Sequence, residues 1–138
     1  MDQKLTMLSS VPMFTGCAAK DLVEIGRLAE EVDVPAGKVL AKEGTSGHEF
    51  FVIAQGNVEI TKDGKPVRTL GPGDHFGELA MLGRVPRTAT ATTTTPATLF
   101  VLGDREFASL LAEQPQIREN VLRSVALWIS EIAPGKTN

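Results

Sequence analysis

The segment F-G-E-L-A-M-L-G-R-V-P-R-T-A, residues 76–89, brings a carboxylate at Glu78 and a guanidinium at Arg87 onto one short stretch of chain. Gly77 permits backbone angles and close approaches that a side chain would block. The five residues after it favour a helix, which should therefore begin there. Pro86 restricts the residue before it to extended angles, so the helix should end before Pro86 and the chain should leave in a fixed direction. The segment predicts a sharply turned frame that presents one acid and one base.

This frame predicts a site for a phosphate joined to a sugar. The free N–H groups at a helix start suit one phosphate, and Arg87 can bind phosphate oxygens bidentately. Glu78 would repel a phosphate, so its expected partner is a hydroxyl donor such as a ribose 2′-OH. The alternative interpretation is a surface ion pair between Glu78 and Arg87, an arrangement that is common and weak.

The motif F-G-E-L-A-x-L-x-x-x-P-R-T-A resembles the phosphate-binding cassette of the cyclic nucleotide-binding domain family. In that family the glutamate holds the ribose 2′-OH, the arginine holds the cyclic phosphate, and amides of the short helix complete the anion site. The resemblance places the first two roles on Glu78 and Arg87. The other positions that it implies are the amides of Gly77, Leu79 and Ala80 and the far wall at Thr88 and Ala89.

Outside the cassette, the pattern of apolar residues indicates a mainly β chain with flanking helices. Apolar residues at three- and four-residue steps predict a helix over about 18–31. Short apolar runs divided by glycines predict an antiparallel β roll over about 31–103, and two helices should follow over about 104–132. Roughly residues 10–132 resemble the family layout, which implies an antiparallel β jelly roll, or double-stranded β-helix. We expect residues 1–138 to form a single cyclic nucleotide-binding domain, with a short phosphate-binding helix inside the roll.

Four local features make this layout specific. The apolar run Phe50–Ile53 predicts a strand that is buried on both faces. The dipeptide Asp63-Gly64 predicts a tight hairpin, because it tolerates positive φ angles. Asp104 is a predicted N-cap for the first C-terminal helix, and the apolar segment Val11–Phe14 should dock on the body of the domain.

The last predicted helix raises the question of what covers the ligand. In the family a C-terminal helix folds over the pocket and covers the base, and here Arg123, Leu127 and Trp128 are the candidates for this role. Trp128 fits a core contact or a homodimer contact equally well. Thr88 resembles a threonine found in members that accept cGMP, but cAMP binders share it. Thr88 therefore gives no firm base preference. The resemblance implies cAMP as the first ligand and leaves cGMP open.

Composition narrows the class of protein. The chain has 138 residues, 42% of them hydrophobic, with a net charge of -3 and no run of Lys or Arg, so we expect no direct nucleic-acid partner. Cys17 is the single cysteine, which excludes an internal disulfide and predicts a small core-facing residue. No long apolar segment follows the polar N-terminus, so we expect no membrane span and a cytoplasmic location.

Two other function classes remain open from the sequence. A cupin-like metal-dependent enzyme would use His48 and His75, but the spacing of metal ligands around them is poor, and both are interpreted as exposed turn residues. A ligand-free interaction scaffold is the other alternative. The favoured interpretation is a regulatory module that is not an enzyme and needs no cofactor beyond its cyclic nucleotide. No basic helix-turn-helix follows the last helix, so it should signal through a protein effector or a fused output domain.

Overall fold

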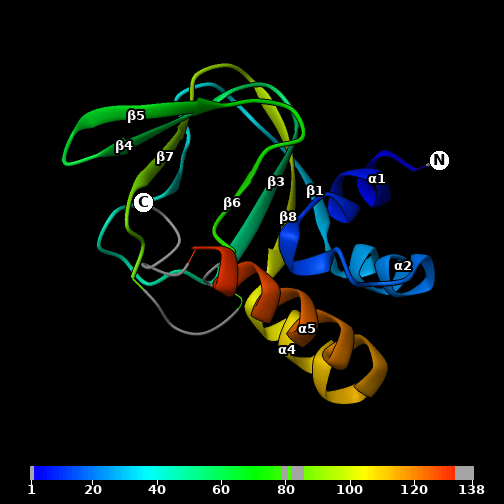
Figure 1. Ribbon diagram of the computed structural model, residues 1–138. Helices are drawn as coiled ribbons and strands as arrows, with labels where there is room; N and C mark the ends of the chain where they lie inside the picture. The colour runs from blue at the N-terminus through cyan, green and yellow to red at the C-terminus, as the bar shows by residue number, and fades with distance from the viewer. Residues whose placement is uncertain (1, 79–80, 82–85, 133–138) are drawn as a thin grey trace.

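The structure, a computed structural model, describes residues 2–78, 81 and 86–132. Within this part of the chain, the strands form two four-stranded antiparallel sheets (Figure 1). The first sheet has the order β1 (Glu30–Val34), β8 (Ala97–Gly103), β3 (Glu49–Gln55) and β6 (His75–Phe76). The second has the order β2 (Val39–Ala41), β7 (Thr90–Thr93), β4 (Val58–Lys62) and β5 (Lys65–Leu70). The arrangement confirms the predicted antiparallel jelly roll with flanking helices.

Helices cover the outer face of the first sheet, where Figure 1 shows them beside β1 and β8. They are α1 (Gln3–Ser9), the 3-10 helix η1 (Pro12–Phe14), α2 (Ala19–Leu28), α4 (Asp104–Glu113) and α5 (Pro115–Ile132). The predicted phosphate-binding helix falls mainly on residues 79–80 and 82–85, which lie outside the described residues. Among the described residues, these helices therefore lie on one side of the β roll.

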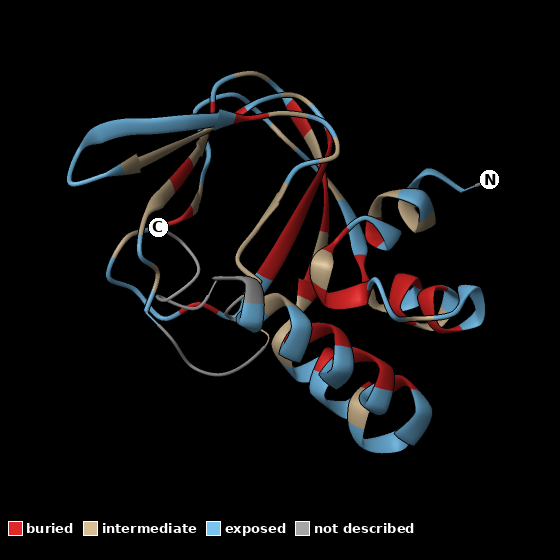
Figure 2. Cartoon of the chain, in the orientation of Figure 1, coloured by how far each residue is buried: buried red, intermediate tan, exposed pale blue. Residues whose placement is uncertain are grey.

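Strand β3 separates two hydrophobic cores, because its side chains point alternately to opposite faces. Phe50 and Val52 pack with the helices, whereas Phe51 and Ile53 pack between the two sheets. Figure 2 shows the strand buried along almost its whole length. The predicted strand with two buried faces is confirmed.

Polar contacts hold the first part of α5 against the N-terminal helices. The buried carboxylate of Asp21 accepts a hydrogen bond from Nδ2 of Asn120 at 2.9 Å, and the amide of Gly16 donates to Oγ of Ser124 at 2.7 Å. We call these four residues the α5 anchor. Apolar side chains of α5 as far as Val125 also pack in the helical core. Beyond that point the last turns of α5 run towards the β roll (Figure 1).

The β4–β5 hairpin projects from the body of the molecule (Figure 1). Asp63 and Gly64 form its turn with φ angles of 53° and 76°, as the Asp-Gly dipeptide predicts. The side chains of Lys65 to Thr69 are exposed, and Leu70 returns the chain to the core.

Two predicted helix boundaries are wrong. Helix α2 spans Ala19–Leu28 rather than about 18–31, because Ala29 takes extended angles and Glu30 already pairs with Val101 in β8. Asp104 is not the N-cap of α4; Gly103, the last residue of β8, holds that position. In both places a strand continues directly into or out of a helix, and strand pairing decides the boundary rather than local propensity.

Helix α1 was not predicted from the sequence, although the docking of Val11–Phe14 is confirmed by their burial. Lys4 of α1 donates from Nζ to the carbonyl oxygens of Gly26 and Ala29, at 3.0 and 2.8 Å. It therefore satisfies carbonyl groups at the end of α2.

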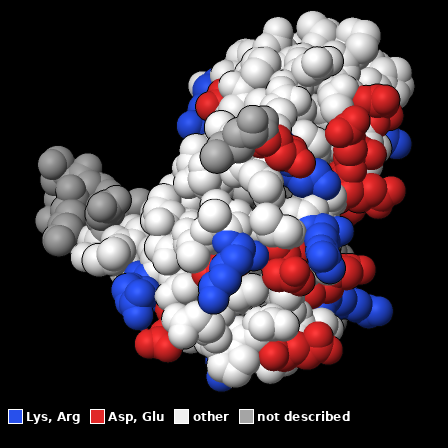
Figure 3. Space-filling model, turned by 90° about the vertical axis from the view of Figure 1, so that its right-hand side faces the viewer, with Lys and Arg blue, Asp and Glu red and all other residues white. Residues whose placement is uncertain are grey.

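The surface charges and the character of the helices relate to the predictions about nucleic acid and membranes. Among the described residues on the face shown in Figure 3, Lys and Arg side chains are interspersed with Asp and Glu rather than gathered into a basic patch. None of the described helices combines the length and apolar character that crossing a bilayer requires.

Candidate functional site

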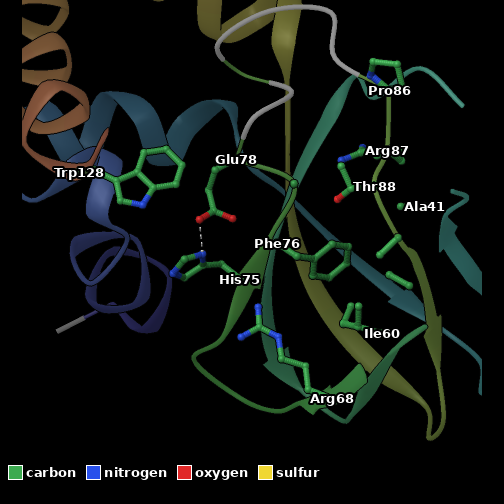
Figure 4. A pocket seen from close by; sticks show the side chains of 13 residues that line it. Ala41, Ile60, Arg68, His75, Phe76, Glu78, Pro86, Arg87, Thr88 and Trp128 are labelled. Carbon is green, nitrogen blue, oxygen red and sulfur yellow. Dashed lines mark ion pairs between the residues drawn. The ribbon is translucent and has the colours of Figure 1, made fainter. Parts of the chain in front are cut away.

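A pocket of about 350 Å³ opens on the side of the roll that the end of α5 approaches (Figure 4). Both sheets and α5 contribute to its wall, and its volume lies within the usual range for small-molecule sites. The lining residues are Ala41, Ile60, Arg68, His75, Phe76, Gly77, Glu78, Pro86, Arg87, Thr88, Ala89, Ala91 and Trp128.

Two glycines make room for the side chain of Arg87. A Cβ atom at Gly77 would lie 2.7 Å from Nη1 of Arg87 and 2.8 Å from the carbonyl oxygen of Glu49. A Cβ atom at Gly47 would lie 2.7 Å from Nε of Arg87. Gly77 also has a φ angle of 89°, which favours glycine on backbone grounds alone. We call Gly47 and Gly77 the glycine slot.

The guanidinium of Arg87 is fixed at one nitrogen and partly buried. Its Nη2 donates to the carbonyl oxygen of Glu49 at 2.7 Å, and its central carbon lies 6.0 Å from the ring centroid of Phe51. Burial lowers the pKa of Arg87 from its ordinary value, and the charge of the Glu49 carboxylate opposes that shift. Arginine nevertheless stays charged at neutral pH, and partial removal from water strengthens its attraction for an anion.

The backbone around Arg87 is paired with the loop Gly44–Gly47. Ser46 and Pro86 form an isolated antiparallel bridge. The amide of Arg87 donates to the carbonyl oxygen of Thr45 at 2.7 Å, and the amide of Gly44 donates to the carbonyl oxygen of Arg87 at 2.8 Å. The end of the cassette that carries the cation is therefore held by main-chain contacts as well as by the glycine slot.

The other end of the cassette follows β6, which pairs with β3. The ring of Phe76 stacks on Phe51 with centroids 4.8 Å apart. His75 places Nδ1 2.9 Å from Oε2 of Glu78, and both side chains are largely buried. The angles at this contact are not those of a formed hydrogen bond, and Nδ1 has no other partner among the described residues. The pair is a close electrostatic contact beside the pocket.

A second cation, Arg68, and an indole, Trp128, also line the pocket. Figure 4 shows Arg68 reaching in from β5 and Trp128 from α5. With histidine counted as neutral, the charged side chains among the described lining residues are Glu78, Arg68 and Arg87, which sum to a net charge of +1. The arrangement favours a small anion that also carries hydroxyl groups and an aromatic ring.

Five of the predicted ligand-binding residues line this one pocket. They are Gly77, Glu78, Arg87, Thr88 and Ala89. The other two predicted positions, Leu79 and Ala80, lie outside the described residues.

Of the three candidates for covering the base, Trp128 lines the pocket. Arg123 does not line it, and its guanidinium lies 3.4 Å from oxygens of both Asn120 and Glu119. Leu127 does not line it either, and the residue is 63% exposed. Of the three residues predicted to cover the base, Trp128 is therefore the one that the structure places at the pocket.

The structure adds three residues that were not predicted as part of the ligand-binding site: Gly47, Arg68 and His75. The interpretation of His75 as an exposed turn residue is wrong, because it pairs with Val52 of β3 and its side chain is only 22% exposed. A strand of two residues is too short to show a period in sequence. Arg68 lies opposite Ile60 in the β4–β5 ladder. The pairing of these two strands was the signal that could have shown that the Arg68 side chain points to the same face as Ile60.

Within the described residues, no group of three His, Cys, Asp or Glu side chains could hold a metal ion. His48 lies 3.4 Å from Asp104, whereas His75 contacts Glu78, so the two histidines belong to different contacts. This part of the chain does not provide the ligand set that a cupin-like metal centre requires.

Comparisons with known proteins agree with this geometry. The sequence profile described as "Cyclic nucleotide-binding domain" matches residues 31–114. A cyclic nucleotide-gated potassium channel of Mesorhizobium japonicum is 36% identical over 121 residues, which cover 88% of this chain and 33% of the channel. The chain thus spans about a third of the length of the channel relatives that it matches.

Two solved structures resemble the fold. The N-terminal domain of a transcriptional regulator from Streptomyces coelicolor A3(2) superposes with a TM-score of 0.86 at 27% identity, covering 100% of this chain and 97% of that one. The regulatory domain of Toxoplasma gondii PKA, in a co-crystal with cAMP, gives a TM-score of 0.71 at 32% identity, covering 78% of this chain and 42% of that one. The chain belongs to the cyclic nucleotide-binding domain family, and it is a regulatory or sensor domain of that class.

Proposed function

We propose that the pocket binds a purine 3′,5′-cyclic nucleotide, with cAMP as the first ligand to test and cGMP beside it. The observation that carries the proposal is that Arg87, seated in the glycine slot, shares one pocket with Glu78. The guanidinium of Arg87 binds the cyclic phosphate, and the Glu78 carboxylate accepts a hydrogen bond from the ribose 2′-OH. Amides of Gly77, Leu79 and Ala80 complete the phosphate contacts, the last two from outside the described residues. The co-crystallised relative supports cAMP as the first choice.

The charge of the pocket supports a ligand with a single phosphate. A cyclic phosphodiester carries one negative charge, which equals the net charge of the described lining in magnitude and is opposite in sign. The seat around Arg87 is narrow, because it lies between two glycines that leave no room for a Cβ. Thr88 and Ala89 line the wall next to it.

Calorimetric titration with cAMP, cGMP and 2′-deoxy-cAMP tests the assignment. Loss of one hydrogen bond to a charged acceptor is worth about 1.5–3 kcal/mol, so the deoxy analogue should bind roughly tenfold to a hundredfold more weakly than cAMP. Equal affinity for the two would contradict the role of Glu78. If none of the three bound, the proposed function would be wrong.

The signal in this proposal is closure of α5 over the base. The α5 anchor holds the helix at Asn120 and Ser124, while Trp128 lies in the pocket wall further along the same helix. A ligand that contacts Trp128 would favour the closed position of these last turns. Amide exchange of residues 126–132 should slow when cAMP binds, and that of residues 117–125 should change less. Unchanged exchange in both halves would contradict closure.

The proposed role is regulation without catalysis, with output through a partner protein or a fused domain. The relatives include a channel and a transcriptional regulator, so this kind of domain is combined with different outputs. The absence of catalysis is tested by incubating the protein with cAMP and measuring recovery of intact nucleotide by chromatography. Enzyme-dependent loss of cAMP would contradict it.

A further inference from the structure

His75 contributes a nitrogen atom that has no settled partner. Its Nδ1 is buried and lies 2.9 Å from Oε2 of Glu78, without hydrogen-bond angles. A buried polar atom in a native structure ordinarily has a partner, so an exception at a pocket wall calls for an explanation.

The ring of His75 is held where this contact can form. Its backbone pairs with Val52 in β3, and its ring lies 6.0 Å from the ring of Phe50 between centroids, tilted by 54°. Phe50 is itself fully buried in the helical core. The histidine is therefore positioned by the sheet, next to the Glu78 carboxylate.

The contact also gives the two carboxylate oxygens of Glu78 different partners. Oε2 of Glu78 faces His75, which leaves Oε1 to accept from a ligand hydroxyl. Resting on the proposed function, we infer that His75 is the positioning residue of the ribose contact: it orients Glu78 through Oε2, and its protonated form tightens binding of the cyclic nucleotide.

The direction of the pH effect follows from the charges around the ring. The charged groups that line the same pocket among the described residues are Glu78, Arg68 and Arg87, while β3 and α5 present Phe50 and Trp128. Carboxylates, guanidinium groups and a cyclic phosphodiester do not ordinarily titrate between pH 6 and pH 8, whereas imidazole does. A protonated His75 adds positive charge next to an incoming anion. We therefore expect the affinity for the cyclic nucleotide to rise as the pH falls from 8 to 6.

Two substitutions separate orientation from charge. His75→Asn keeps an amide nitrogen near the position of Nδ1 but cannot become charged, so it should retain the preference for cAMP over 2′-deoxy-cAMP and lose the pH response. His75→Phe keeps the packing against Phe50 and should lose both properties. His48→Asn is the matched control, because His48 is half exposed and contacts Asp104 instead. It should retain both properties.

The experiment is calorimetric titration of the wild type and the three variants with cAMP and 2′-deoxy-cAMP at pH 6 and pH 8, with thermal melts of each. A pH response that survives in both His75 variants would overturn the charge role. A full preference for the 2′-OH in His75→Phe would overturn the positioning role. Both results are distinct from failure of the proposed function, in which the wild type would bind neither ligand at either pH.

Discussion

The two ends of the pocket are built in different ways. At one end Arg87 is fixed by the glycine slot, by the carbonyl oxygen of Glu49 and by main-chain pairing with the loop Gly44–Gly47. At the other end Trp128 comes from α5, and the α5 anchor lies one to two turns before it. The residues on either side of Trp128 are exposed. Residues on rigid elements set binding geometry, whereas less tightly held elements can move. The difference predicts that affinity depends mainly on the Arg87 end and response on the Trp128 end.

The largest effect should come from removing the fixed cation. Arg87→Ala should weaken cAMP binding about a thousandfold, or about 4 kcal/mol, because the phosphate loses its charged hydrogen-bond donor. Calorimetry measures the loss. Arg105→Ala, at an exposed position of α4, is the control and should bind normally. A small effect of Arg87→Ala would mean that the amides alone hold the phosphate.

A chemical probe reports on the anchored helices. Burial, and then the charge of Asp21, raise the pKa of Cys17 to about 11. The thiolate is the reactive form, so at pH 8 the folded protein should react with iodoacetamide about a hundredfold more slowly than the unfolded chain. The folded rate should keep rising as the pH goes from 9 to 11, where the unfolded rate levels off. Equal rates in native buffer and in guanidinium chloride would contradict the burial of this thiol.

Breaking the α5 anchor should lower the stability of the fold, with a smaller effect on phosphate binding. Asn120→Ala removes a buried donor to Asp21 and should lower the free energy of unfolding by about 2 kcal/mol, measured by urea denaturation. Glu119→Ala is the neighbouring control, because its ion pair with Arg123 is solvent-exposed and should contribute less than about 0.5 kcal/mol. If the two variants were equally stable, Asp21 and Asn120 would not act as an anchor.

The glycine slot can be tested without altering any charged group. Gly47→Ala would place a Cβ against Nε of Arg87 and should weaken cAMP binding about tenfold by displacing the guanidinium. Gly71→Ala is the matched control, because the nearest atom to its Cβ would be 3.4 Å away, on Asn57. Unchanged affinity in Gly47→Ala would show that Arg87 can bind phosphate from another position.

The smallest effect should come from the end that moves. Trp128→Ala should weaken cAMP binding about fivefold, at the low end of the 1–3 kcal/mol found for stacking of a base on an aromatic side chain. Leu127→Ala, which alters the preceding exposed residue, should bind normally. Trp128→Ala should also lose the slowing of amide exchange that cAMP causes at the end of α5. If Trp128→Ala lost as much affinity for cAMP as Arg87→Ala, the conclusion that affinity depends mainly on the Arg87 end would be wrong.

Local chemistry explains which parts of the site could be predicted. The hairpin turn at Asp63-Gly64 was predictable because it depends on the φ angles of two adjacent residues. The presence of Glu78 and Arg87 in one pocket was predictable because a short motif connects them. Their roles as ligand contacts remain predictions.

The rest depended on contacts between distant segments. Gly47 meets Arg87 only because the loop before β3 pairs with the end of the cassette, and no pattern near Gly47 indicates that pairing. His75 faces Glu78 because β6 takes its register from β3. The boundary at Asp104 was wrong for the same kind of reason, because β8 extends to the residue before it.

The projecting β4–β5 hairpin has a practical consequence. Its tip at Asp63-Gly64 is exposed, while Arg68 on its return strand reaches the pocket wall. Exposed loop tips tolerate inserted domains better than other sites. A fluorescent protein grafted between these two residues would be coupled to the wall through one short strand, which makes this tip a natural place to engineer an optical reporter of ligand occupancy.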